Sequence, residues 1–274
     1  ISIGEDGYGI TAGIEFEGVR WPILSAAIPN PVEQFRVDVP IDGKLALVGT
    51  IDGHVMSLEF DLNGGAGTFS VPEIYTDPVP VKSLRLRGQT TGEFREVRIE
   101  EARLSLKRGT VTARATVTRL GRDLNLRLDG GITDCNMSLV RRYWPNMVGI
   151  DAREWVLENI RRGEVDDATM SLVARFPETD LTRAVIGSLN GAIRVHGVEF
   201  NYLTPLPTAR DVAANITFTD KRFDIAFTGG RLNELQMDEG SAVITGLDVE
   251  DQDIDIDIMT VSYTHLRAHE TRHD

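Results

Sequence analysis

Apolar and polar residues alternate along most of this chain, and this two-residue period predicts β-strands. Segments 97–106, 111–117, 124–128, 223–227 and 254–258 follow the pattern. Turn sequences such as Lys107-Arg108-Gly109 separate them. Short strands joined by such turns form antiparallel meanders rather than β-α-β units. The chain is therefore predicted to be mainly β.

The alternation places apolar side chains on one face of each strand and charged side chains on the other. A change of phase at Glu100–Glu101 predicts a β-bulge. Two packed sheets with a closed core would bury such faces, and a long curled sheet would present them in a groove; the pattern fits both. The apolar-face candidates are Val97, Ile99, Leu104, Leu106, Val111, Ala113, Ala115, Val117, Leu124, Leu126, Leu128, Phe223, Ile225 and Phe227.

Residues 137–163 interrupt the strands with a helical pattern. A first helical turn is expected to stop at Pro145, and a helix over 151–162 follows. Asp151 is the expected N-cap, Glu154 completes a capping box, and Gly163 ends the helix. An apolar stripe predicts that this helix packs against the sheet as a plug or cover; it consists of Ala152, Trp155, Val156, Asn159 and Ile160.

Composition narrows the range of partners. The 274 residues carry 29 basic and 42 acidic side chains, so the net charge is −13. This charge disfavours binding to nucleic acid or to an anionic membrane surface. Cys135 is the single cysteine, which excludes a disulfide framework. No apolar run reaches the roughly 20 residues that a membrane-spanning helix needs. Because Ile1 already begins a strand-like segment, an internal piece of a longer protein is expected.

The sequence contains no recognisable catalytic motif, whether a nucleophile elbow, a zinc-protease helix, a phosphate loop or a dinucleotide fingerprint. Outside the last 14 residues only His54 and His196 could serve a histidine-dependent mechanism. Asp253, Asp255 and Asp257 share one strand face and are expected to be solvated rather than to bind Ca²⁺. No enzymatic activity, cofactor or metal is expected.

The last residues, 261–274, differ abruptly from the acidic strand before them. His265, His269 and His273 would line one face of a helix and could bind Zn²⁺ there. The segment resembles a translated sequencing-adaptor tail, however. It is expected to be non-native and is excluded from the fold prediction.

Residues 142–178 resemble the central region of AsmA-like envelope proteins of the YhdP-type branch. The similarity extends over about residues 90–258, although Leu206-Pro207 stands where the family often has Trp-Pro. The matching positions are Tyr143, Trp144, Pro145, Ala152, Arg153, Trp155, Val156, Gly163, Val165 and Ala168.

The resemblance implies a long, antiparallel, twisted and curled sheet that forms an open groove, with a helical insertion at about 136–162. β-sheet units over 1–130 and 166–260 would flank an insertion over 131–165. Segments 18–49 and 197–229 are weakly similar and also predict two related β units.

The resemblance implies that this chain is a segment of a periplasmic bridge-like lipid-transfer protein. Phospholipid acyl chains would lie along the apolar groove, on the way between the two membranes of a Gram-negative bacterium. An inner-membrane anchor and the contacts to both membranes would belong to parts of the protein outside this chain. Two alternatives stay open: a structural or interaction β module without lipid transport, and a carboxylate-dependent hydrolase on a β scaffold.

Overall fold

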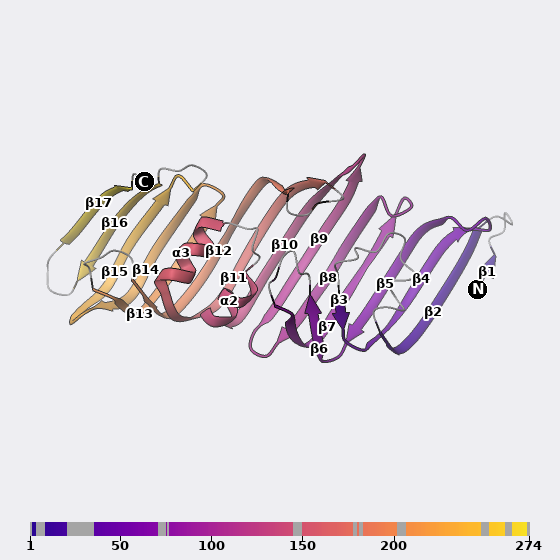
Figure 1. Cartoon of the computed structure of the whole chain (residues 1–274), viewed down its shortest axis with the longest axis horizontal. Coiled ribbons are helices and arrows are strands. Elements are labelled where there is room, and N and C mark those ends of the chain that lie inside the picture. The colour runs from indigo at the N-terminus through magenta and orange to yellow at the C-terminus, as the bar shows by residue number, and fades with distance from the viewer. Residues whose placement is uncertain are drawn as a thin grey trace. The chain divides into compact units, whose positions relative to one another are not determined.

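The computed structural model describes residues 2–3, 9–20, 36–70, 75, 77–144, 150–177, 180, 183–201, 207–247, 252–260 and 265–272, which form strands and two short helices (Figure 1). The elements are β1 Ser2–Ile3, β2 Gly9–Val19, β3 Arg36–Asp38, β4 Ile41–Thr50, β5 Val55–Gly64, β6 Gly67–Ser70, β7 Val79–Thr91, β8 Glu96–Leu106, β9 Thr110–Leu120, β10 Asp123–Asn136, α2 Met137–Tyr143, α3 Ile150–Asn159, β11 Ile160–Pro177, β12 Val185–Phe200, β13 Ala209–Thr219, β14 Arg222–Leu232, β15 Leu235–Thr245, β16 Gln252–Thr260 and β17 His265–Arg272.

The predicted fold class is confirmed: the described residues form open antiparallel sheet with two short helices. Most strands pair with the next strand in sequence, as in a meander. The predicted bulge is also confirmed, because the β7–β8 and β8–β9 registers both shift at Glu100–Glu101. Neither of the described helices is long and apolar enough to cross a membrane.

Contacts divide the chain into two compact units. Unit 1 comprises residues 1–130 and 172–187, and unit 2 comprises residues 131–171 and 188–274. Strands β10, β11 and β12 contribute residues to both.

Unit 1 is a sheet in which β2, β4, β5, β7, β8 and β9 pair in that order. A small corner adjoins it, because β6 pairs with the first residues of β7 and β3 pairs with β6. The buried apolar residues of unit 1 gather largely around this corner, and they include Val37, Val39, Ile41, Val79, Val81 and Leu106.

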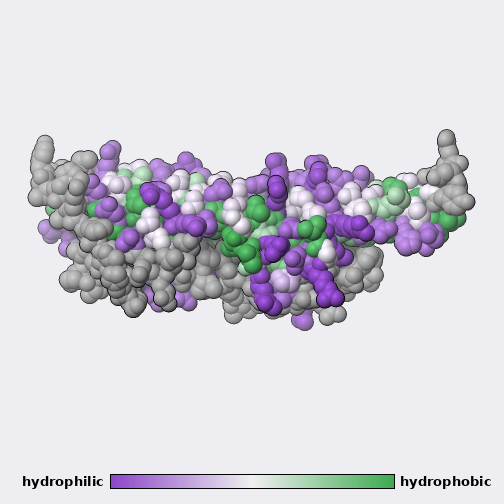
Figure 2. Space-filling model, turned by 90° about the horizontal axis from the view of Figure 1, so that it is seen from above, coloured by the Kyte–Doolittle hydropathy of each residue, from purple (hydrophilic) through white to green (hydrophobic). Residues whose placement is uncertain are grey.

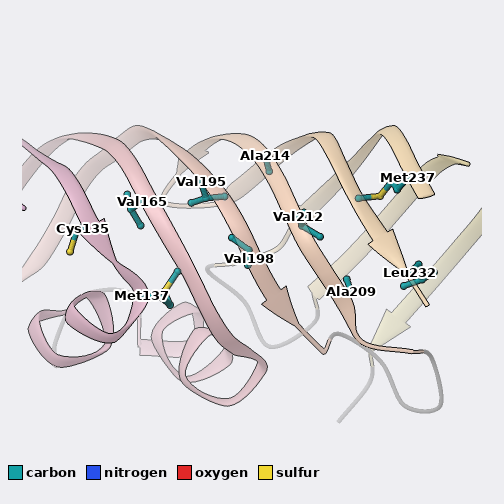
Figure 3. Packing of buried hydrophobic residues seen from close by; sticks show 10 residues of the cluster. All are labelled: Cys135, Met137, Val165, Val195, Val198, Ala209, Val212, Ala214, Leu232 and Met237. Atoms are coloured by element: carbon teal, nitrogen blue, oxygen red, sulfur yellow. The ribbon is translucent and has the colours of Figure 1, made fainter. Parts of the chain in front are cut away.

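Unit 2 is a sheet in which β12 to β17 pair in sequence order, with α2 and α3 against it (Figure 1). The helices lie over one end of the strands and share a buried cluster with them (Figure 3). This cluster consists of Cys135, Met137, Val165, Val195, Val198, Ala209, Val212, Ala214, Leu232 and Met237.

The two segments that are similar in sequence contain the same irregularity. Gly18 in β2 and Gly197 in β12 have φ values of 63° and 60°, in the left-handed region that glycine adopts without steric cost. The register shifts at both places, so that Val19 pairs with Ile41 and Val198 pairs with Val212. A glycine bulge thus bends both strands at corresponding positions.

Residues 265–272, which the fold prediction left out, form β17 and pair with β16, with His269 opposite Asp255. An edge strand offers unpaired N–H and C=O groups that recruit a following segment of almost any composition. His265 and His269 therefore lie on a strand and not on a helix, so the helical zinc geometry is absent.

A glycine–aromatic pair lies in the sheet of unit 2. A Cβ at Gly191 would lie 2.5 Å from Cζ of Phe218 and 2.2 Å from the backbone oxygen of Thr169. The Phe218 ring therefore covers the bare backbone of Gly191, its partner on the neighbouring strand. Phe60 covers Gly88 in unit 1 in the same way, with Cζ 2.8 Å from that glycine's Cβ position.

Gly191→Ala should therefore destabilise the protein by about 2 kcal/mol, since the added methyl group displaces a ring and a backbone oxygen. Urea unfolding measures this effect. Gly187→Ala in the same strand is the control, because its Cβ meets its nearest atom at an ordinary 3.6 Å. Equal stability of the two variants would contradict the close packing at Gly191.

Candidate functional site

Paired strands of unit 2 bring apolar residues side by side on one face of the sheet. Residues that pair directly across antiparallel strands point to the same face, and neighbours along one strand point to opposite faces. A central row joins Ile193, Ile216, Ile225, Ala242 and Ile256. The flanking rows join Val195, Ala214 and Phe227 on one side, and Gly191, Phe218, Phe223, Ile244 and Ile254 on the other.

Unit 1 repeats this arrangement over a wider set of strands. Its rows are Phe16, Gly43, Leu62, Leu86, Ala102 and Ala113; Ile14, Leu45, Phe60, Gly88, Ile99 and Ala115; Ala12, Leu47, Leu58, Thr90, Val97 and Val117; and Gly64, Leu84, Leu104 and Val111. Each row crosses successive strands without a charged residue. Both units therefore have one apolar face.

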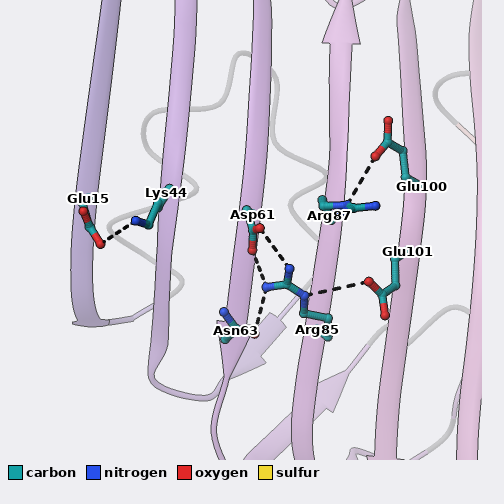
Figure 4. Close-up of polar contacts among 8 residues, drawn as sticks. All are labelled: Glu15, Lys44, Asp61, Asn63, Arg85, Arg87, Glu100 and Glu101. Atoms are coloured by element: carbon teal, nitrogen blue, oxygen red, sulfur yellow. Dashed lines mark hydrogen bonds and ion pairs between the residues drawn. The ribbon is translucent and has the colours of Figure 1, made fainter.

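Charged residues occupy the opposite face of unit 1 (Figure 4). Arg85 donates hydrogen bonds to Asp61 at 2.9 Å and to Asn63 at 3.0 Å. Arg87 lies 3.3 Å from Glu100. These pairs span neighbouring strands, so they add cross-strand attraction to the backbone hydrogen bonds. Because they are partly exposed, each contributes about 1 kcal/mol or less.

Unit 2 also carries ion pairs on its polar face. Arg222 donates from Nε to Asp224 at 2.8 Å, and this hydrogen bond lowers the pKa of the Asp224 carboxyl below its ordinary value. Asp224 immediately precedes Ile225, which points to the apolar face. Neighbouring residues of one strand thus belong to two chemically different surfaces.

The apolar face remains partly accessible to solvent. Its large side chains are only half-buried across most of the rows, and Ile14 is 56% exposed. Hydrophobic residues accordingly reach the molecular surface between hydrophilic ones (Figure 2). Ordinary antiparallel sheets pack their apolar face on a core, and large exposed apolar patches mark binding surfaces. The apolar face is therefore the candidate functional site.

The two helices cover one end of this face in unit 2. Leu139, Val140, Val156 and Ile160 pack against the buried cluster, and the rings of Trp155 and Phe200 lie 6.4 Å apart. Central-row residues such as Ile225 are at the margin of the same cluster. The prediction that the helical segment packs on the sheet is confirmed.

Each helix end has an identifiable cause. Asn136 caps α2, its side chain accepting from the Leu139 N–H at 3.0 Å. Trp144 ends α2 in an extended conformation with ψ of 121°, as expected for a residue before proline. Pro145 itself lies outside the described residues.

The expected bounds of the second helix were wrong. Helix α3 begins at Ile150, so Asp151 lies within it, and it ends at Asn159 rather than before Gly163. Ile160 opens β11, which carries Gly163 at a φ of 155° against Val198. Sheet pairing therefore overrides the helical propensity of Ile160, Arg161 and Arg162.

Arg141 ties the two helices together. Its guanidinium donates to the backbone oxygen of Leu157 at 2.7 Å and also to that of Ile160. The Leu157 carbonyl belongs to the last turn of α3, where carbonyls have no partner within the helix, and the Ile160 carbonyl belongs to the first residue of β11. Arg141 thus supplies a contact at the end of the helix, where Gly163 was expected to terminate it.

The structure places the predicted apolar-face residues as follows. Val97, Ile99, Leu104, Val111, Ala113, Ala115 and Val117 lie in the rows of unit 1, and Phe223, Ile225 and Phe227 lie in those of unit 2. Leu106 is buried at the end of β8. Leu124, Leu126 and Leu128 are half-buried along β10. Arg127 and Asp129 alternate with them along the strand and line a hollow together with arginines of the polar face.

Several of the positions that carry the family resemblance lie in or beside the two helices. Tyr143 and Trp144 are half-buried at the end of α2, and Arg142 lies 5.8 Å from the Tyr143 ring centroid. Arg153 is half-buried in α3, as are Trp155 and Val156. Ala152 lies in α3, but its side chain is outside the described part.

Sequence reasoning missed many members of the face in the first third of the chain. Leu45, Leu47, Leu58, Phe60 and Leu62 belong to its rows. The alternating segments KLALV and SLEFDL carried the signal, which Gly43 and Gly49 interrupt. Ile193, Val195 and Ile216 of unit 2 were missed in the same way.

Residues with potential for catalysis or metal binding are dispersed. Nδ1 of His196 lies 2.8 Å from Asp166, which Arg194 also contacts at 3.9 Å. Asp255 and Asp257 pair with Val243 and Ser241 on the polar face. Within the described ranges, no three His, Cys, Asp or Glu residues are placed to hold a metal ion.

Comparison with protein families finds one match. A family model described as YhdP protein matches residues 26–265, which is most of the chain. The matched range includes both helices and the rows of β4 to β16. Curated proteins and solved structures give no match.

Arg141→Leu should destabilise the helical segment by about 2 kcal/mol, because the carbonyls of Leu157 in α3 and of Ile160 just after it lose a charged donor. Amide hydrogen exchange is expected to accelerate in α3 relative to β13–β15. Arg142→Leu is the matched control, since Arg142 is exposed and next in sequence. Unchanged exchange in the Arg141 variant would rule out its capping role.

Proposed function

The chain belongs to the YhdP family, and we propose that it is a segment of an envelope protein that carries phospholipid along the apolar face of its sheet. The family consists of envelope proteins of the AsmA-like type and is not a known enzyme family. On this proposal the segment works in the periplasm of a Gram-negative bacterium. Parts of the protein outside this chain provide the inner-membrane anchor and the contacts to both membranes.

The continuous rows of apolar residues carry this proposal. In unit 2 the central row crosses five strands, a span of about 19 Å at the usual strand spacing. An acyl chain laid along such rows replaces water at half-buried leucine, isoleucine and phenylalanine side chains. Each methylene group removed from water contributes about 0.8 kcal/mol, so ten of them contribute about 8 kcal/mol before ordering costs.

Neighbouring rows provide a path rather than a pocket. Ile225, Phe223 and Phe227 differ little in their chemistry, and the rows of unit 1 are of the same kind. A chain in contact with one row therefore gains little by staying there, which favours movement along the face. Transport of this kind forms and breaks no covalent bond, so it requires no catalytic residue, cofactor or metal.

Position-specific photocrosslinking in β14 tests the proposal. A photoreactive residue at Ile225 or Phe227 should crosslink to copurifying phospholipid when the full chain is expressed with a periplasmic signal. The same residue at Asp224 or Ala226 is the matched control, because these neighbours point to the polar face. Equal crosslinking at both pairs of positions would contradict an acyl-chain path on the apolar face.

Charge substitution gives an independent measurement. Ile225→Asp should lower the copurified phospholipid by about tenfold, since a loss of 1.4 kcal/mol in binding corresponds to that factor. Ala226→Asp introduces the same charge on the other face and should leave the lipid content unchanged. Native mass spectrometry of the intact chain measures both. Lipid-free wild-type protein would instead favour a structural β module.

A further inference from the structure

A hollow of about 510 Å³ lies in unit 1, and its charged lining residues belong to the polar face. Its size is within the range of small-molecule binding sites. Residues of four successive strands line it: Arg87 of β7, Arg98, Ile99 and Glu100 of β8, Arg114, Ala115 and Thr116 of β9, and Arg127 and Asp129 of β10.

The pairing register brings the arginines together at the β-bulge. Arg98 pairs with Thr116, and Ile99 pairs with Ala115. The next pair is Ala102 with Ala113, so Glu100 and Glu101 together oppose Arg114. A two-against-one bulge bends the strand and re-aims its side chains. The irregularity at Glu100–Glu101 therefore shapes the hollow.

Positive charge exceeds negative charge in this hollow. Four arginines face two carboxylates there, a surplus of two charges in a chain whose net charge is −13. Glu100 lies 3.3 Å from Arg87. Arg98 donates to Glu96 at 2.9 Å, so a bound anion would chiefly relieve the repulsion between Arg114 and Arg127. Because Arg87, Arg98, Arg114 and Arg127 are exposed, such an anion reaches them from solvent.

We propose that this hollow binds a phosphate-bearing anion. Guanidinium groups present planar pairs of N–H donors that match phosphate oxygens, and they keep their charge at any physiological pH. Arg114 and Arg127 come from adjacent strands and are the principal contacts. Thr116 adds a hydroxyl donor at the same site. The site is on the face opposite the acyl-chain path, so it does not depend on the proposed function.

Two sources could provide this phosphate: a soluble phosphate compound or the headgroup of an anionic lipid. The probes are pyrophosphate, titrated calorimetrically at low salt, and vesicles of phosphatidylglycerol in phosphatidylcholine, tested by cosedimentation with the intact chain. Binding of both probes assigns the site to phosphate groups in general. Binding of the vesicles alone assigns it to a lipid headgroup, and binding of pyrophosphate alone assigns it to a soluble ligand.

Substitutions distinguish binding in the hollow from nonspecific attraction of an anion to positive surface charge. The double variant Arg114→Gln with Arg127→Gln should weaken binding of the effective probe at least fivefold. Arg103→Gln removes a positive charge from the same face at a residue that does not line the hollow, and it should leave binding unchanged. Circular dichroism verifies that both proteins fold.

Two results would overturn the proposal. One is absence of binding for both probes in the wild-type chain. The other is an equal loss in the Arg103 variant, which would indicate attraction to surface charge without a site. Ile225→Asp, which disturbs the apolar face, should retain full binding, so failure of the lipid path and failure of this site give different results.

Discussion

Register-matched pairing between neighbouring strands is the constraint on which the rest of this structure depends. Side chains alternate strictly along a strand, so a slip by one residue would carry a whole apolar row to the charged face. Ile193, Ile216 and Ile225 form one row only because β12, β13 and β14 pair in a single register. The bulge at Gly197 shifts the β12–β13 register beyond Val195, and the bulge at Gly18 shifts the β2–β4 register beyond Phe16, so both leave the rows intact.

Local patterns in the sequence were sufficient to predict much of this arrangement. Alternation around Val97, Val111 and Phe223 identified the strands and their apolar faces, because the pleat requires nothing beyond a two-residue period. The phase change at Glu100–Glu101 was enough to predict a bulge. Pro145 correctly indicated the end of the first helix, since the residue before proline avoids the helical conformation.

Features that depend on distant residues could not be predicted. The end of α3 is set by strand pairing from Ile160 and by a side chain on another helix, Arg141, neither of which leaves a local signal. Pairing of residues 265–272 with β16 reflects what an open edge offers rather than the composition of the tail. The arginine hollow likewise requires side chains from four neighbouring strands, so no single segment reveals it.

Because strands pair in sequence order, the stability of the sheet is approximately a sum of interactions between neighbouring strands. Each strand of β12–β16 is held chiefly by the strand before it and the strand after it, as repeats are held in a solenoid protein. Folding can then begin at any hairpin and spread outward, with little cost of closing long loops. A lesion in one strand should therefore loosen its neighbours and leave remote hairpins folded, and a whole hairpin is the unit whose insertion or removal disturbs the remaining pairs least.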